Sequence, residues 1–209
     1  MFLGIDIGTS GVKAVLVDAV GIVRDQQTAP LSVSRPHPLW SEQRPGAWWE
    51  ATEAAVLRLD PGLRAQVEGI GLSGQMHGAT LLGPDDRPLR PAILWNDGRS
   101  FAECDAIEAA VPQSRAITGN IAMPGFTAPK LLWLKAHEPD IFAQVTSVLL
   151  PKDYVRLCMT GDKASDLSDS AGTLWLDTGA HIEEQLARSL RQLRGEFGVG
   201  HAVPVTLTA

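Results

Sequence analysis

The residues best suited to chemistry in this chain lie near its amino end, around one carboxylate, Asp6. The strand-like run Phe2–Ile7 alternates large apolar and small residues, so that Asp6 shares a face with Gly4 and Gly8. Because these neighbours have no side chains, the face leaves room for a ligand beside the carboxylate. The turn that follows offers two hydroxyls and several backbone N–H groups, which are donors that a phosphate accepts. These residue types predict a phosphate-handling hairpin with Asp6 near the transferred group.

The same hairpin also has a purely structural interpretation. Its glycines can serve the turn geometry alone, and Asp6 can accept hydrogen bonds from N–H groups of the turn. The pattern is neither a Walker A loop nor a GxGxxG fingerprint, because the turn leads into a second apolar run, Ala14–Val17, rather than into a helix. These residues by themselves leave both interpretations open.

A second glycine-rich stretch, Gly69–Leu82, has strand character at both ends. Its middle carries Gln75, Met76 and His77 between glycines. A histidine taken alone is more often a satisfied structural residue than a ligand. The stretch is therefore a second candidate site, whose function depends on what else it meets.

Asp97 follows a short apolar strand predicted at Ala92–Trp95, whose tryptophan we expect in the core. Polar groups just past the carboxyl end of a strand are where α/β proteins tend to place ligands. Asp97 can equally cap the helix predicted from about Ser100, so both functions stay open. Asp166 and Asp169, further along, are better explained as Asx-turn residues than as metal ligands.

The composition is that of an ordinary globular protein, with 209 residues, 44% of them hydrophobic and 20% charged. The net charge of −6 argues against nucleic acid or an anionic membrane as a partner, while a bound nucleotide stays compatible with it. Cys104 and Cys158 lack metal-ligand spacing and are predicted to be free thiols, both used as small apolar residues. No signal-peptide pattern opens the chain and no apolar run approaches about 18 residues, so we expect a cytoplasmic protein.

Around the candidate residues, the sequence predicts an α/β domain with a mixed sheet flanked by helices. Three extended runs come first, and strands then alternate with helices. The proline-rich segment Ser34–Pro45 is expected to lack regular structure. Helices are predicted to begin at about Pro45 and at a cap at Thr127, and to span Ser100–Val111, Pro151–Gly161 and Ile182–Phe197. We expect Trp48 and Trp49 in the buried stripe of the first helix, and Phe101 to point inward from the helix at Ser100–Val111.

Seven stretches carry a resemblance to a known family. They are GIDIGTSGVK (Gly4–Lys13), SRPHPLWSEQ (Ser34–Gln43), GQMHGATLL (Gly74–Leu82), LRPAILWNDGR (Leu89–Arg99), TGN…MPGFTAPKLLWL (Thr118–Leu134), LLPKDYVRL (Leu149–Leu157) and ASDLSDSAGTLWLD (Ala164–Asp177). Together they resemble the amino-terminal lobe of the FGGY carbohydrate kinases and, within that family, its bacterial xylulokinase group. The first motif is shared with hexokinase, actin and Hsp70 relatives, whereas QMHG and WND in this order are far more specific.

The resemblance implies a ribonuclease-H-like (actin-like ATPase) lobe, with the active site in the cleft between two such lobes. It makes Asp6 a catalytic carboxylate, near the transferred phosphoryl group or, through water, its metal ion. It places Gly8, Thr9, Ser10 and Lys13 on the phosphate and nucleotide side.

On the sugar side, the resemblance makes Met76 and His77 substrate contacts, and Asp97 matches a further substrate-side position. The implied reaction transfers the γ-phosphoryl group of ATP, bound with Mg²⁺, to D-xylulose and gives D-xylulose 5-phosphate. In a full enzyme of this type, an aspartate of the second lobe takes the proton from the C5 hydroxyl.

The resemblance divides the chain into a kinase lobe at 1–177 and a divergent tail at 178–209, where one amphipathic helix is expected. Relative to a complete member of the family, the second lobe is absent, and a truncation or a changed reading frame is the expected cause. One lobe cannot close a two-lobe cleft, so this chain is expected to be nearly inactive alone.

Two other hypotheses compete with a kinase lobe that acts with a complementing second lobe. One is a stand-alone module that binds a ketose or another polyol without chemistry. The other is a truncated fragment whose tail helix covers the surface meant for the second lobe, by folding back or by pairing with a second copy.

Overall fold

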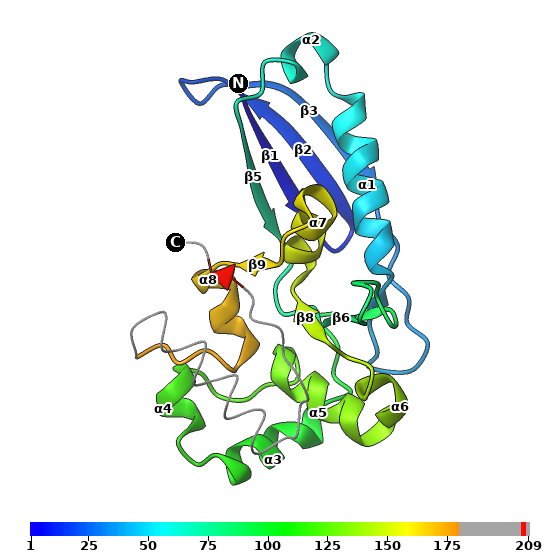
Figure 1. Cartoon of the computed structure of the whole chain (residues 1–209), viewed down its shortest axis with the longest axis vertical. Coiled ribbons are helices and arrows are strands. Elements are labelled where there is room, and N and C mark those ends of the chain that lie inside the picture. Colours follow the sequence, from blue (N-terminus) through cyan, green and yellow to red (C-terminus); the bar gives the residue numbers. More distant parts are fainter. Residues whose placement is uncertain (180–205, 208–209) are drawn as a thin grey trace.

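In a computed structural model of the chain, we describe residues 1–179 and 206–207 (Figure 1). The tail helix predicted at 182–197 lies outside the described residues. None of the helices within residues 1–179 has the length and apolar character needed to cross a bilayer.

A four-stranded sheet forms one end of the molecule (Figure 1). Its strands are β1 (Phe2–Ile7), β2 (Gly11–Val17), β3 (Val23–Pro30) and β5 (Gly69–Gly74), in the order β3-β2-β1-β5. β2 runs antiparallel to both β1 and β3, whereas β5 runs parallel to β1. The predicted mixed sheet is therefore confirmed.

The alternation in β1 assigns one face of this sheet to the core. Leu3, Ile5 and Ile7 are buried together with the β2 residues Val12 and Ala14. Two helices, α1 (Pro45–Arg58) and α7 (Pro151–Thr160), pack on this face. The opposite face, which carries Asp6, faces away from this core.

The predicted start of α1 at a proline and its buried stripe are confirmed. Pro45 occupies the first turn, where its missing N–H has no intrahelical partner to lose. Trp48 is fully buried, and Thr52 and Ala55 follow it on the buried side of the helix, while Trp49 is partly buried against the same cluster. The tryptophan pair is thus core, as predicted.

The other end of the molecule is built mainly from helices and short strand pairs (Figure 1). β6 (Thr80–Leu82) pairs with β8 (Ser147–Leu149), and β4 (Glu42–Gln43) pairs with β7 (Ala92–Ile93), both antiparallel. The remaining elements are α2 (Pro61–Arg64), α3 (Phe101–Ala110), α4 (Ser114–Thr118), α5 (Thr127–His137), α6 (Pro139–Phe142), β9 (Ala164–Ser165), α8 (Leu167–Ser170), η1 (Ala171–Thr173) and β10 (Thr206–Leu207), which pairs with β9 in parallel.

The structure corrects several local predictions. The segment expected to lack regular structure contains β4, because its prolines stand before and after those two residues rather than within the pair. Phe101 is 71% exposed instead of pointing inward, and Trp95 is 45% exposed instead of lying in the core. Both cysteines are free as predicted, but Cys158 is exposed and only Cys104 behaves as a buried apolar residue. Thr127 opens α5 without capping it.

Candidate active site

The sheet places Asp6 in a row of polar residues across three strands. Its cross-strand partners are Lys13 on β2 and Ser73 on β5. Residues directly opposite in neighbouring strands share a face, so these three side chains project from the same side of the sheet. In β1 and β5 the next pair along this face is Gly4 with Gly71. Asp6 and Lys13 are both exposed, and the glycines beside them leave the approach open.

This face fits a magnesium ion that arrives with a nucleotide better than a metal held by the protein alone. Among the described residues, no group of three or more metal-binding side chains comes together. Mg²⁺ commonly binds one or two carboxylates and otherwise keeps water and phosphate oxygens. The exposed Asp6 carboxylate would hold such an ion directly or through water, where the ion would neutralise phosphate charge.

The turn between β1 and β2 is tight and leaves its first glycine little freedom. The Gly8 N–H donates to the carbonyl of Gly11 at 3.0 Å, and a Cβ on Gly8 would lie 3.0 Å from the same oxygen. A Cβ on Gly11 would come within 2.8 Å of the Ala29 carbonyl oxygen. Ser10, at the tip of the turn, is exposed and available to a ligand.

The hydroxyl of Thr9, in contrast, is engaged within the protein. It donates to Oε1 of Gln75 at 3.0 Å and accepts from the indole N–H of Trp95 at 3.0 Å. This bond explains why Trp95 stands at the surface rather than in the core. Thr9 therefore connects the hairpin of β1 and β2 to the second glycine-rich stretch, a link that the sequence does not reveal.

A buried amide completes this network. The side chain of Gln43 donates to the carbonyls of Thr9 at 2.7 Å and Ser32 at 3.3 Å. Its oxygen accepts from Nε2 of Gln75 at 2.8 Å and from the Trp48 indole at 2.9 Å. All the hydrogen-bonding positions of the Gln43 amide are thus used. We call Thr9, Gln75 and Gln43 the amide network.

His77 lies between β5 and β6 in an unusual main-chain conformation, with a φ of 61°. Its Nδ1 is 2.6 Å from the carbonyl oxygen of Gly172, and its ring stands edge-on to Phe126 with centroids 4.7 Å apart. Burial lowers the pKa of His77, although the bond to Gly172 opposes this shift. Met76, its neighbour, is 52% exposed and open to a ligand.

Gly172 is required where it stands. A Cβ at this position would lie 2.2 Å from Cε1 and 2.5 Å from Nδ1 of His77, far inside contact distance. The hydroxyl of Thr127 and the Nζ of Lys130 both donate to the carbonyl of His77, at 3.1 Å and 2.8 Å. Thr127 thus uses the hydroxyl that we expected to cap α5. These contacts come from residues 50 to 95 positions away along the chain, so sequence reasoning missed them.

The structure places Asp97 in a buried ion-pair cluster. One carboxylate oxygen accepts from the Ser41 N–H at 2.6 Å, and both oxygens accept from the Arg99 guanidinium at 2.8–2.9 Å. The N-cap of α3 is Ser100. The expected alternative of a helix cap at Asp97 is therefore wrong, while its contact with a substrate stays a prediction.

Arg99 extends this cluster. It pairs with Glu42 at 2.8 Å and lies over the ring of Trp40, with its guanidinium carbon 3.7 Å from the ring centre. Arg90 pairs with the same Glu42 oxygen at 2.5 Å and with Glu138 at 3.0 Å. We call Glu42, Arg90, Asp97 and Arg99 the buried ion cluster.

Lys152 holds the segment that carries Gly172. Its Nζ pairs with Asp153 at 2.6 Å, Asp166 at 2.8 Å and Asp169 at 3.0 Å. Asp166 also accepts from the N–H of Asp169 as the N-cap of α8, so its predicted local hydrogen bond is present, whereas the Asp169 carboxylate pairs with Lys152. Burial would lower the pKa of Lys152, but the carboxylates prevail and raise it.

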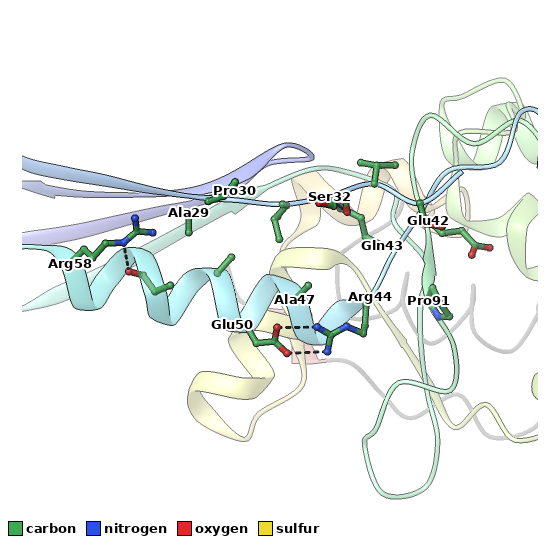
Figure 2. Close-up of a pocket in the computed structure, with 15 residues that line it drawn as sticks. Ala29, Pro30, Ser32, Glu42, Gln43, Arg44, Ala47, Glu50, Arg58 and Pro91 are labelled. Atoms are coloured by element: carbon green, nitrogen blue, oxygen red, sulfur yellow. Dashed lines mark hydrogen bonds and ion pairs between the residues drawn. The ribbon is translucent and has the colours of Figure 1, made fainter. Parts of the chain in front are cut away.

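A groove of about 680 Å³ is lined by two main parts of the chain (Figure 2). One part is the end of β3 together with the residues that follow it, and the other is α1. Arg44 and Glu50 form a two-bonded pair, both bonds at 2.9 Å, at its rim. The described residues that line this groove include none of the predicted site residues. The groove borders the candidate site, because Gln43 of the amide network and Glu42 of the buried ion cluster are among the residues that line it.

Comparison with known proteins assigns the family. Residues 1–186 match the model of the amino-terminal domain of the FGGY family of carbohydrate kinases. The chain is 62% identical over 178 residues to a xylulose kinase of Escherichia coli K12, covering 85% of this chain and 37% of that protein. It is 60% identical over 179 residues to a xylulose kinase of Klebsiella pneumoniae, with the same coverage of both proteins.

A crystal structure of a Brucella ovis xylulose kinase is similar in fold, with a TM-score of 0.87 and 51% identity, covering 99% of this chain and 42% of that one. The chain belongs to the FGGY family of carbohydrate kinases. Its fold is the actin-like ATPase fold of these enzymes, as the resemblance predicted. Within the family, the relatives named here are bacterial xylulose kinases, and the chain spans less than half of their length.

Proposed function

We propose that this chain supplies the first lobe of an ATP-dependent kinase that phosphorylates D-xylulose to D-xylulose 5-phosphate. The observation that carries the proposal is the amide network, which joins the hairpin of Asp6 to the stretch of His77. A phosphate side and a sugar side then belong to one hydrogen-bonded unit. Phosphoryl transfer depends mostly on such positioning and on charge stabilisation.

In this proposal each residue has a limited task. Asp6 holds the metal ion of MgATP, which neutralises phosphate charge when bound, and Lys13 attracts the phosphates from the neighbouring strand. Ser10 and the N–H groups of the turn donate to phosphate oxygens. Met76 and His77 contact the sugar. The base for the sugar hydroxyl and the closure of the cleft come from the part of the relatives that this chain does not span, so the chain alone is proposed to be nearly inactive.

The proposal is tested by joining this chain to the remaining, carboxy-terminal part of the E. coli relative and measuring ADP release with D-xylulose. We expect Asp6→Asn to lower kcat by about 10²-fold or more, because it removes a charge that acts on the transferred group. Asp105→Asn, at an exposed position of α3, is the control and should match the parent. Faster phosphorylation of glycerol or gluconate than of xylulose would contradict the assignment of D-xylulose as the substrate. Turnover by the unjoined chain would contradict the proposal that the chain alone is nearly inactive.

Binding of D-xylulose without chemistry is the second candidate, because the contacts that hold His77 all come from this chain. A sugar that covers the ring buries His77 further and favours its neutral form. Since burial already lowers the pKa of His77, affinity should be constant above about pH 6.5 and fall up to tenfold per unit in more acidic solution.

Calorimetry of the full chain with D-xylulose between pH 5 and 8 measures this dependence. Lys130 and Asp169 also act on the pKa of His77. The His77→Gln variant separates their titration from that of the imidazole, because it should lose the acid limb. Acid weakening that persists in His77→Gln would contradict the assignment to His77.

A further inference from the structure

The main chain at His77 needs external support. A φ of 61° lies in the left-handed region, which a residue with a Cβ adopts only when its surroundings hold it there. The main-chain conformation sets the direction of the Cα–Cβ bond of His77, and the contacts with Gly172 and Phe126 then fix the ring at the end of that bond. Whatever fixes the main chain of His77 therefore also decides where the ring can present its nitrogens.

The orientation of the ring assigns its protons. A carbonyl oxygen can only accept, so the 2.6 Å contact between Nδ1 and the Gly172 oxygen requires a proton on Nδ1. In the neutral ring, Nε2 is then an acceptor. Within residues 1–179, no hydrogen bond to Nε2 is present, and the ring is only half-buried. A sugar hydroxyl could donate to this nitrogen.

Lys130 is the least expected part of the support. Its side chain has no exposure, and its Nζ donates to the carbonyls of His77 at 2.8 Å and Gly125 at 2.7 Å. Among the described residues, Lys130 takes part in none of the ion pairs, although the charge of Asp97 acts on it and opposes the lowering of its pKa by burial. A neutral amine has two N–H donors, which matches the two carbonyls, and burial lowers the pKa of Lys130 to about 7.

We propose that Lys130 is a positioning residue of the sugar site. Together with Thr127 it holds the carbonyl of His77, and so keeps the left-handed main chain and aims Nε2 at the ligand as an acceptor. This inference rests on the proposed function, because it concerns how the same site is held. Lys130 itself has no exposed atom and does not touch the sugar.

Two variants of the full chain test the proposal. Lys130→Met removes both donations while keeping a long buried side chain, and Thr127→Val removes the second donor at nearly constant volume. Thr127→Ser, which retains the hydroxyl, is the matched control. We expect the dissociation constant for D-xylulose to rise at least tenfold in Lys130→Met and severalfold in Thr127→Val, and to stay within twofold of the parent in Thr127→Ser.

Nitrogen-15 NMR of the imidazole gives a readout that a merely structural lysine would not move. In the parent at pH 7.5, His77 should show a protonated Nδ1 and an unprotonated Nε2, with its signals identified by their loss in His77→Gln. In Lys130→Met the two nitrogens should approach a common average. Unchanged His77 signals and xylulose affinity in a folded Lys130→Met variant would overturn the proposal.

If Lys130→Met does not fold, Thr127→Val decides by the same two measurements, and parent-like behaviour of that variant counts against the proposal. If the parent chain binds no D-xylulose, the second candidate function, sugar binding by this chain alone, fails, and the affinities are then compared in the joined enzyme. The NMR comparison still decides whether Lys130 and Thr127 hold His77, so the two failures are distinguishable.

Discussion

Arg99→Met is expected to lower the free energy of unfolding by about 3–5 kcal/mol. The side chains of Arg99 and Asp97 are almost fully buried, and Glu42 is nearly so. Without the guanidinium, each carboxylate oxygen of Asp97 keeps at most one N–H donor, from the main chain of Ser41 or of residue 99. Among the described ion pairs, Glu42 is then paired with Arg90 alone. The stack on Trp40 is lost as well. Urea unfolding followed by circular dichroism measures the change.

Arg115→Met is the matched control for this experiment. Arg115 pairs with Glu108 at 2.6 Å, but its side chain is 58% exposed, and exposed pairs contribute about 0–1 kcal/mol. The two substitutions remove the same groups and differ in burial. A loss below about 1 kcal/mol in Arg99→Met would show that the buried ion cluster gives little net stability.

Gly172→Ala is expected to weaken D-xylulose binding by at least tenfold, about 1.4 kcal/mol. The added methyl group would occupy the space of the His77 ring, which also packs edge-on against Phe126. The ring must leave its place, and Nδ1 then loses the Gly172 carbonyl. Calorimetry at pH 7.5 gives the affinity, and urea unfolding gives the accompanying loss of stability, about 1–3 kcal/mol for an overpacked site.

Two comparisons make this prediction specific. Gly179→Ala adds the same methyl group where the nearest atom, an Asp177 oxygen, is 3.5 Å away, so it should resemble the parent. In a His77→Ala background, Gly172→Ala should cost much less stability, because the atoms that it meets are gone. Equal stability losses in both backgrounds would show that the contact with the imidazole is not the cause.

The elements that follow a local pattern could be predicted from the sequence. The alternation in β1 gave its buried face, and the proline at its start together with an apolar stripe gave α1. These features depend on neighbouring residues and on elementary periodicity. The position of Asp6 on an open, glycine-lined face follows in the same way.

The environment of His77 could not be predicted, because it is built from distant segments. Gly172, Phe126 and Lys130 meet His77 only after α5 and η1 have packed around the segment between β5 and β6. One signal was present: a lysine in the apolar run of α5 is unusual, since an unpaired buried amine is unfavourable. The prediction that Trp95 lies in the core was wrong for a related reason. Its indole N–H donates to Thr9, which lies far away in the sequence, in the turn between β1 and β2.

The amide network also limits which sequences this lobe can accept. Gln43 satisfies Thr9, Ser32, Trp48 and Gln75 at once, all through one amide group. Replacing Gln43 alone leaves the buried Trp48 indole and the buried Gln75 amide without this partner, and a buried unpaired group costs about 1–3 kcal/mol. Residues from separate segments of the chain share this one amide group, so a substitution of Gln43 is expected to be tolerated best when its partners change with it.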